Sequence, residues 1–341
     1  MTTNDAPRIP LRAIQWKEYK LHLIDQRQLP TREEWLILDD ATSVANAISD
    51  MAVRGAPAIG IAAAYGLVLG VKEKGLEALD EVADELAASR PTAVNLQWAL
   101  QRMRRAAGKE GASLESLEAE AKRIHAEDIE QNRTMAALGA AYLLPGSRIL
   151  THCNTGALAT AGIGTALGVI RQANIEGKLA KVMFTETRPW MQGARLTAWE
   201  LAHDGIRATL LTEGAVAGEL AHEGLDWLIV GADRIAANGD TANKVGTFAL
   251  AIMARQFGAK VMVVAPSGTV DMSLKSGADI PIEYRDGIEL LKAAGMEKAP
   301  DGITVANPAF DITPAQWIDV IVTEQGTVEK PGTASMRKLL G

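Results

Sequence analysis

The sequence predicts an α/β protein, in which a smaller, mostly helical N-terminal part precedes a parallel sheet with helices on both faces. Segments with helical spacing dominate the chain before residue 145. After Pro145, short runs rich in Val, Ile and Leu alternate with helical segments, which is typical of a covered parallel sheet. The length of 341 residues exceeds the usual size of a single core, so two domains are expected.

The N-terminal part begins with segments of alternating apolar residues, such as 14–24, which predict strands or a small hairpin. A helix is expected from Thr42, its predicted cap, to the interruption at Arg54–Pro57. Further helices are expected over about 58–74, near 77–88, over 91–107 and from 113 to about 143. Ser113 is the expected cap of the longest helix, which either presents a solvated charged face or joins the two domains.

The C-terminal part contains six runs with the composition of strands. They span residues 148–152, 181–186, 207–212, 226–233, 260–266 and 318–324. Helical segments of ten or more residues are expected between the first five, and the sixth follows an irregular segment. Because ligands of parallel sheets bind at the carboxyl ends of the strands, we expect a site at one rim. That rim contains His152-Cys153, Thr185-Glu186, Gly231–Asp233 and Pro266.

Charge and composition argue against several classes of protein. The net charge is −7 and no block of Lys or Arg occurs, so we expect no nucleic-acid partner. A single cysteine allows no intrachain disulfide and fits a reducing compartment. The N-terminus lacks the apolar core of a signal peptide, and the longest apolar stretch, 59–71, is too short to span a bilayer. We therefore expect a cytoplasmic protein without a membrane partner.

The single cysteine, Cys153, directly follows a predicted strand and precedes a segment with a helical pattern. A thiol beside a helix N-terminus gains thiolate character, whereas most free cysteines are buried packing residues. His152 points to the opposite face of the strand, so we expect it to be structural rather than the base for Cys153. The spacing alone leaves both catalysis and packing open for Cys153.

Three further positions carry groups suited to chemistry. Asp233 ends an apolar strand, where burial raises the pKa of an acid toward neutrality; the alternatives are a salt bridge to Arg234 or a loop cap. The turn Arg54–Pro57 offers an anion site between two helices. Asn243-Lys244 is expected to open a helix and to bind a phosphate there.

The run G-I-G-T-A-L-G at 162–168 is similar to a dinucleotide fingerprint, and Glu186 stands where a ribose-binding acid would lie. However, the first glycine follows the strand too late, inside the expected helix, and the spacing differs from the fingerprint. Helix packing therefore explains these glycines better than NAD binding. The chain has no nucleotide-binding P-loop, and its five histidines lack metal-ligand spacing, so we expect no cofactor and no metal.

Five motifs together resemble the methylthioribose-1-phosphate isomerase family. They are R-G-A-P-A-I-G (54–60), T-H-C-N-T-G-A-L-A-T (151–160), T-E-T-R-P-W-M-Q-G-A-R-L-T-A-W-E-L (185–201), G-A-D-R-I-A-A-N-G-D-T-A-N-K-V-G-T (231–247) and N-P-A-F-D-I-T-P (307–314). The resemblance extends from about Leu11 to Leu340. The wider family includes the regulatory subunits of the translation initiation factor that exchanges guanine nucleotide.

The resemblance implies a homodimer whose chain has a small N-terminal domain and a larger Rossmann-like catalytic domain. We place these domains at residues 1–125 and 126–341. It also implies conversion of an aldose 1-phosphate to a ketose 1-phosphate in methionine salvage. Carried over by motif, Cys153 and Asp233 are the catalytic residues. The phosphate and sugar contacts would come from Arg54, Gly55, Ala56, Arg90, Gln192, Asn243 and Lys244.

Such a substrate carries phosphate on its anomeric oxygen, so its ring cannot open as an ordinary hemiacetal does. We expect Asp233 to protonate the ring oxygen and Cys153 to handle the hydrogen that moves from C2 to C1, as a proton or as a hydride. One alternative is isomerisation of a related sugar, 5-deoxyribose 1-phosphate or ribose 1,5-bisphosphate. The other is a regulatory subunit of the same fold, although such relatives generally lack the cysteine–aspartate pair.

Overall fold

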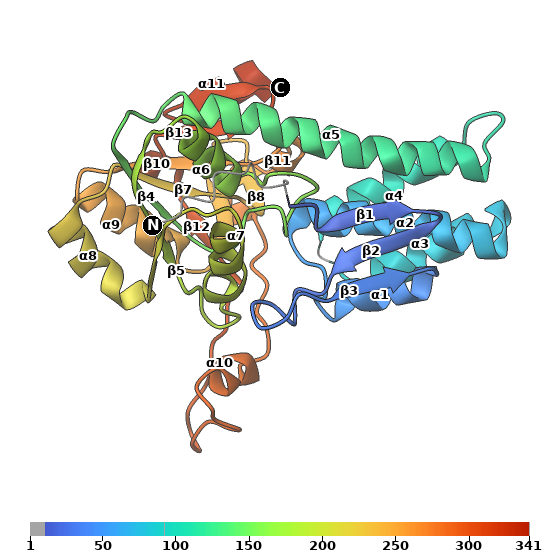
Figure 1. Cartoon of the computed structure of the whole chain (residues 1–341), viewed down its shortest axis with the longest axis horizontal. Coiled ribbons are helices and arrows are strands. Elements are labelled where there is room, and N and C mark those ends of the chain that lie inside the picture. Colours follow the sequence, from blue (N-terminus) through green and yellow to red (C-terminus); the bar gives the residue numbers. More distant parts are fainter. Residues whose placement is uncertain (1–10, 92, 341) are drawn as a thin grey trace, which may run out of the picture.

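The computed structural model of the protein describes residues 11–91 and 93–340. Residues 1–10, on which the prediction about a signal peptide rests, lie outside the described residues. Thr92, in the motif around Arg90, lies outside them as well. The described chain forms a smaller, mostly helical body and a larger α/β body, and one long helix, α5 (Leu114–Ala140), extends along both (Figure 1). The predicted boundary between residues 125 and 126 falls within α5 and stays a prediction.

The N-terminal elements follow the sequence closely. They are β1 (Ile14–Lys17), β2 (Lys20–Ile24), β3 (Trp35–Leu38), α1 (Ala41–Ser49), α2 (Ala56–Lys74), α3 (Leu79–Ala88) and α4 (Val94–Ala107). The predicted hairpin is confirmed and gains a third antiparallel strand. The predicted cap at Thr42 is wrong, because the Asp40 carboxylate accepts the Ser43 N–H and caps α1. Ser113 caps α5 as predicted.

Helix α2 is the centre of the N-terminal core. Every residue from Ala58 to Val71 is buried, which is typical of a helix surrounded by others. Gly60 lets α4 approach, since a Cβ there would lie 2.7 Å from the carbonyl oxygen of Asn95. The helix is longer than the apolar stretch 59–71, and by length and composition it would be able to cross a membrane, which corrects the prediction of a segment too short to do so. Most of it is buried inside the protein.

The C-terminal core is built on a seven-stranded sheet in the order β14-β13-β10-β7-β4-β5-β6. Its strands are β4 (Ser147–Thr151), β5 (Leu179–Thr185), β6 (Thr209–Leu211), β7 (Trp227–Val230), β10 (Lys260–Val264), β13 (Val320–Thr323) and β14 (Gly326–Glu329). The six predicted strands are confirmed and run parallel, whereas β14, which the sequence did not suggest, pairs antiparallel with β13.

Helices cover both faces of this sheet (Figure 1). They are α6 (Ala166–Ile175), α7 (Ala198–His203), α8 (Val216–Glu223), α9 (Thr247–Gln256), α11 (Thr333–Leu340) and the end of α5. Successive residues of a strand enter different cores: Ile149 packs with α5 and α6, and Leu150 with α8 and α9. The predicted two-sided α/β architecture is confirmed. A π-helical turn at 193–197 runs into α7 and a 3-10 turn at 213–215 runs into α8, so these helical segments, like the others between the first five strands, have the ten or more residues expected.

The order of the strands reverses at β4. The chain moves outward from β4 to β5 and β6, and then returns to the other side of β4 as β7. Ligands of open α/β sheets bind at the carboxyl ends of strands at such a switch point. Cys153 follows β4 and Asp233 follows β7, and these two strands pair directly. The topology therefore places both residues at the crevice.

A second, four-stranded sheet in the order β11-β8-β9-β12 follows the carboxyl end of β7, and the sequence did not predict it. Its strands are β8 (Arg234–Ala236), β9 (Thr241–Lys244), β11 (Val270–Asp271) and β12 (Phe310–Thr313). Asn243 and Lys244 lie on β9, so the prediction that they open a helix is wrong; α9 begins at Thr247. Between β11 and β12 the chain forms a protrusion with the short helix α10 (Ile288–Lys292) (Figure 1).

Replacing Gly60 tests the tight contact between α2 and α4. Gly60→Ala is expected to lower the free energy of unfolding by about 1–3 kcal/mol, because its methyl group meets the Asn95 backbone rather than a flexible side chain. Gly218→Ala is the matched control: nothing lies within 4 Å of its added Cβ. It should be neutral or stabilising by about 0.5–1 kcal/mol, since Ala favours helix. Urea unfolding measures both, and equal stabilities would contradict the close packing.

Candidate active site

A cavity of about 410 Å³ lies at the carboxyl ends of β4 and β7. The nine site residues predicted from the sequence all line it: Arg54, Gly55, Ala56, Arg90, Cys153, Gln192, Asp233, Asn243 and Lys244. From the predicted rim, Gly231-Ala232 and Pro266 line the cavity as well, whereas Thr185-Glu186 are not among its lining residues. The structure thus brings the predicted residues together in one place, while their individual roles stay predictions.

The backbone of Cys153 is held on both sides. Its N–H donates to Thr187 Oγ1 at 3.0 Å, and its carbonyl accepts from Thr197 Oγ1 at 2.6 Å. With φ at 63°, Cys153 has the left-handed conformation that few non-glycine residues adopt. Helix α6 begins only at Ala166, so the prediction that a helix starts soon after Cys153 in the chain is wrong. The loop nevertheless returns, since the N–H of Thr165, the N-cap of α6, donates to the Thr155 carbonyl at 2.9 Å. An irregular loop, residues 153–165, separates β4 from α6.

The glycines of the 162–168 run do not all pack a helix. Gly162 and Gly164 lie in the irregular loop, and only Gly168 lies within α6. Gly164 has φ at 90°, and a Cβ there would lie 2.4 Å from the carbonyl oxygen of Thr155. Gly162 does pack on a helix, because a Cβ there would lie 3.3 Å from the Cα of Ile129 on α5. The helix-packing interpretation is therefore wrong only for Gly164, which serves a tight loop.

His152 is fully buried beside the site. Its Nδ1 lies 2.5 Å from Thr185 Oγ1, and its Nε2 lies 2.9 Å from the carbonyl oxygen of Val245. Burial lowers the pKa of His152 to about 4, so the ring is neutral at physiological pH. Both ring nitrogens have partners other than Cys153, which agrees with the structural role predicted for this residue.

Asp233 has the electrostatic environment of a proton donor. Burial raises the pKa of its carboxyl above the ordinary 3.8, and this shift is opposed by nearby cations: Lys244, Arg54 and Arg90. Arg234 pairs instead with Asp271, at 3.0 Å, so the alternative of a salt bridge between Asp233 and Arg234 is wrong. A carboxyl that keeps its proton at higher pH than usual is able to act as a general acid.

Lys244 links the two predicted catalytic groups electrostatically. Burial lowers the pKa of Lys244, and the negative charges of Cys153 and Asp233 raise it. Its Nζ donates to the carbonyl oxygen of Ala309 at 2.6 Å and lies 4.5 Å from the ring centroid of Phe310. The antiparallel pairing of β9 with β12, with Lys244 opposite Phe310, fixes this position. Lys244 therefore lies within electrostatic range of both predicted catalytic residues.

The anion-binding end of the cavity comes from the N-terminal core. Helix α2 starts at Ala56 and Gly55 is its N-cap. Pro57 has no N–H and the Ala58 N–H donates to the Ala159 carbonyl, so the Ala56 N–H and the positive end of the helix dipole are what the helix start offers to the cavity. Gly55 has φ at 100°, and a Cβ there would lie 2.4 Å from the Cα of Ala159. Only glycine fits this approach of α2 to the loop after Cys153. Arg54, beside it, adds a positive charge.

The sequence missed several residues of the cavity wall. An apolar group consists of Met51, Trp190, Ile280, Ile282 and Phe310. Arg285 also lines the cavity, and its guanidinium pairs with Glu283 at 3.3 Å and Glu289 at 2.6 Å. Buried oxygens on Gln192 and Thr155 have no hydrogen-bond partner within the described part of the chain. Gln192 was predicted, and Thr155, Trp190 and Phe310 had a signal, because each lies in one of the motifs quoted above.

Comparison with known proteins defines the family. The chain matches the sequence model of the Initiation factor 2 subunit family over residues 52–330. It is 54% identical over 337 residues to the methylthioribose-1-phosphate isomerase of Thioalkalivibrio sulfidiphilus, with 97% of each chain covered. The chain belongs to the methylthioribose-1-phosphate isomerase family. The resemblance seen in the motifs is confirmed.

Solved structures agree with this membership. The crystal structure of 5-methylthioribose 1-phosphate isomerase from Pyrococcus horikoshii matches with a TM-score of 0.91 at 41% identity, covering 99% of both chains. A structure described as translation initiation factor eIF-2B, subunit delta, from A. fulgidus matches with a TM-score of 0.87 at 40% identity, covering 97% of this chain and 99% of that one. The isomerase family thus shares its fold with proteins described as initiation-factor subunits.

The loop after Cys153 is also tied to α5. Asp128 Oδ2 accepts the Ala161 N–H at 2.7 Å and lies 3.1 Å from Asn132 Nδ2. Burial raises the pKa of Asp128 from 3.8 to about 6, although the two hydrogen bonds oppose the shift. Above that pH, the protein holds a buried carboxylate between its two cores.

The raised pKa of Asp128 predicts a pH dependence of stability. Between pH 3.8 and about 6 the unfolded chain has lost this proton and the folded chain keeps it, so stability falls as pH rises. Asp128→Asn removes this contribution. The difference in the free energy of unfolding between the variant and wild type should therefore shift in favour of the variant, by on the order of 2 kcal/mol, from about pH 4.5 to pH 7.

Urea unfolding at the two pH values measures the effect. Asp226→Asn is the control, because Arg148 holds the pKa of Asp226 below its ordinary value, outside this window. A difference between wild type and Asp128→Asn that is the same at both pH values would contradict the prediction.

Proposed function

We propose that the protein is a methylthioribose-1-phosphate isomerase, which converts 5-methylthioribose 1-phosphate to 5-methylthioribulose 1-phosphate in methionine salvage. The observation that carries the proposal is one cavity that combines Cys153, Asp233 and cationic groups from both cores. Membership of the isomerase family, at 54% identity over 97% of the chain, supports the same activity.

In this proposal the substrate phosphate is held by groups at opposite walls of the cavity. The N-terminal wall supplies Arg54-Gly55-Ala56 and Arg90, and the C-terminal wall supplies Asn243-Lys244. Backbone N–H groups at a helix start and fixed cations suit a dianion. Gln192, whose buried amide oxygen lacks a partner in the described chain, is suited to a sugar hydroxyl. Binding by two cores fixes the sugar and excludes water.

Asp233 then acts as the acid for ring opening. Its raised pKa keeps a proton available for the ring oxygen, whose bond to C1 must break while the phosphate remains attached. Cys153 handles the hydrogen that passes from C2 to C1, within electrostatic range of Lys244. Turnover in deuterated water tests whether this hydrogen moves as a proton or as a hydride. Solvent deuterium in the product supports proton transfer. Its absence supports either a hydride shift or a proton that is shielded from exchange with solvent.

The cavity wall supports an apolar substituent at C5. The apolar group defined above offers a surface for a methylthio group, whereas a second phosphate needs cations that lack partners. Two further arginines line the cavity, but Arg285 is paired with Glu283 and Glu289, and Arg234 is paired with Asp271. We therefore expect a lower kcat/KM for ribose 1,5-bisphosphate than for methylthioribose 1-phosphate.

A direct assay of the purified protein tests the function. Methylthioribose 1-phosphate, 5-deoxyribose 1-phosphate and ribose 1,5-bisphosphate are compared by kcat/KM. The highest value is expected for the methylthio sugar. Turnover of only one of the other two would assign the related isomerase activity. No turnover of any sugar would favour a regulatory subunit, the activity class suggested by the similarity to the protein described as an initiation-factor subunit.

Substitution of the two central residues tests their roles. Cys153→Ser and Asp233→Asn keep the size of each side chain and remove its acid–base function, so kcat should fall by about 10²–10⁴-fold in each variant. Circular dichroism and binding of inorganic phosphate serve as controls: both variants should remain folded and should still bind phosphate. Near-normal turnover in either folded variant would show that the residue does not have the proposed role.

We also propose that the protein works as a cytoplasmic homodimer without nucleic-acid or membrane partners. The net charge of −7 and the single cysteine support this setting. Light scattering on a size-exclusion column measures the mass directly. A species with the mass of one chain at micromolar concentration would contradict the dimer.

A further inference from the structure

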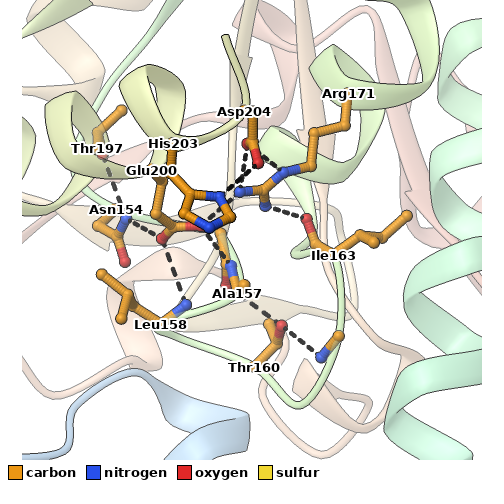
Figure 2. A network of polar contacts seen from close by, with 12 residues as sticks. Asn154, Ala157, Leu158, Thr160, Ile163, Arg171, Thr197, Glu200, His203 and Asp204 are labelled. Atoms are coloured by element: carbon orange, nitrogen blue, oxygen red, sulfur yellow. Dashed lines mark hydrogen bonds and ion pairs between the residues drawn. The ribbon is translucent and has the colours of Figure 1, made fainter. Parts of the chain in front are cut away.

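A buried ion pair lies behind the loop that carries Cys153 (Figure 2). Glu200 on α7 and Arg171 on α6 approach to 2.8 Å, and their side chains are 0% and 11% exposed. Neither residue lines the cavity. Burying two charged groups costs free energy unless hydrogen bonds satisfy their remaining polar atoms. The hydrogen-bond partners of Glu200 and Arg171 therefore indicate the role of the pair.

Glu200 binds the first half of the loop. Its Oε1 accepts from Asn154 Nδ2 at 2.8 Å and from the Leu158 N–H at 3.3 Å. Its Oε2 accepts the Ala157 N–H at 2.7 Å. The chain passes so close that a Cβ on Gly156 would lie 2.1 Å from Oε2. Three donors next to one buried carboxylate fix this stretch of backbone.

Arg171 binds the second half of the loop. Its Nη1 donates to the carbonyl oxygen of Ile163 at 2.6 Å (Figure 2). Its other nitrogens contact Glu200 and also Asp204, whose Oδ2 lies 2.7 Å from Nε. The ion pair therefore connects the two ends of the loop through side chains from two helices.

The network reaches Cys153 through its backbone. Thr197, which precedes α7, donates to the Cys153 carbonyl oxygen at 2.6 Å. Asn154 Nδ2, bound to Glu200, also lies 3.4 Å from Thr197 Oγ1. These contacts hold the backbone of Cys153, which has a left-handed φ and lines the cavity.

We propose that Glu200, charge-paired with Arg171, is a positioning residue that sets the location of the Cys153 thiol. It acts through Asn154, Ala157 and Leu158 and touches no substrate. The effect of Glu200 on turnover rests on the proposed function, whereas its effect on the reactivity of the Cys153 thiol does not. Glu200→Gln replaces one acceptor oxygen by an NH₂ group, which opposes the N–H donors of the loop, and it leaves Arg171 with Asp204 alone as its ionic partner.

The rate of alkylation by iodoacetamide is a specific readout, because Cys153 is the only cysteine of the chain. In Glu200→Gln this rate should change several-fold from wild type, since it depends on the exposure and charge environment of the thiol. With methylthioribose 1-phosphate, kcat should fall by about 10²-fold while KM changes little, as expected when a catalytic group is displaced and the binding groups are not. Asp204→Asn, which leaves the Glu200 contacts in place, should have a smaller effect on both readouts.

Glu120→Gln is the matched control. Glu120 pairs with Arg102 at 2.6 Å, and its side chain is only 8% exposed, but it contacts neither the loop nor the cavity. This variant should lose stability while its alkylation rate and kcat remain near wild type. A comparable change in alkylation rate in both variants would show a general effect of removing a buried charge and would overturn the proposal.

Thr197→Val covers the case in which Glu200→Gln does not fold. It keeps the shape of the side chain and removes the hydroxyl that holds the Cys153 carbonyl. The same direction of change in alkylation rate and kcat is expected. If the folded Glu200→Gln protein, or in its place Thr197→Val, alkylates at the wild-type rate, the positioning role is wrong. Wild-type protein that is inactive on the sugar would refute the proposed function, and the alkylation comparison would still decide the positioning role.

Discussion

The pairing of β4 with β7 is the constraint on which the site depends. The strand order reverses there, so the loop after β4 and the chain after β7 diverge and leave a crevice between them. Both strands are buried on both faces, with alternate residues in two separate cores. A shift of register in either strand would exchange those faces and would also move Cys153 relative to Asp233. The register of these two strands thus determines both the packing of the sheet and the relative positions of Cys153 and Asp233.

The second core completes the cavity and changes its electrostatics. The start of α2 and the loop after Cys153 touch directly, with the Ala58 N–H donating to the Ala159 carbonyl at 3.1 Å. Cations from both cores are then enclosed with Asp233. Burial shifts the pKa of Asp233 upward and that of Lys244 downward, so the same desolvation brings an acid and an amine toward their neutral forms. Proton transfer in the cavity is favoured when the pKa values of its acids and bases are shifted toward the working pH in this way.

The sequence predicted the parts of the fold that have a strong local signal. The six parallel strands are apolar runs, and the nine site residues lie in motifs that the topology brings together. The second sheet was missed because strands such as T-A-N-K in β9 are short and lack apolar alternation. The part of the loop from Ala157 onward was predicted as helix because A-L-A-T-A-G-I-G is rich in small apolar residues. Its real conformation depends on partners remote in sequence, Asp128 and Glu200, which no local pattern reveals.

The irregular shape of that loop explains why buried acids surround it. A loop inside the protein cannot pair its own backbone N–H groups as a helix does, so it needs acceptors from elsewhere. Asp128 supplies one from α5, and Glu200 supplies others from α7. Ala161 is thereby fixed to α5, the helix shared by both cores, and Ala157 and Leu158 are fixed to α7, which packs on the sheet. Because Gly55 of the N-terminal core also packs on this loop, the loop that begins at Cys153 is in contact with both cores.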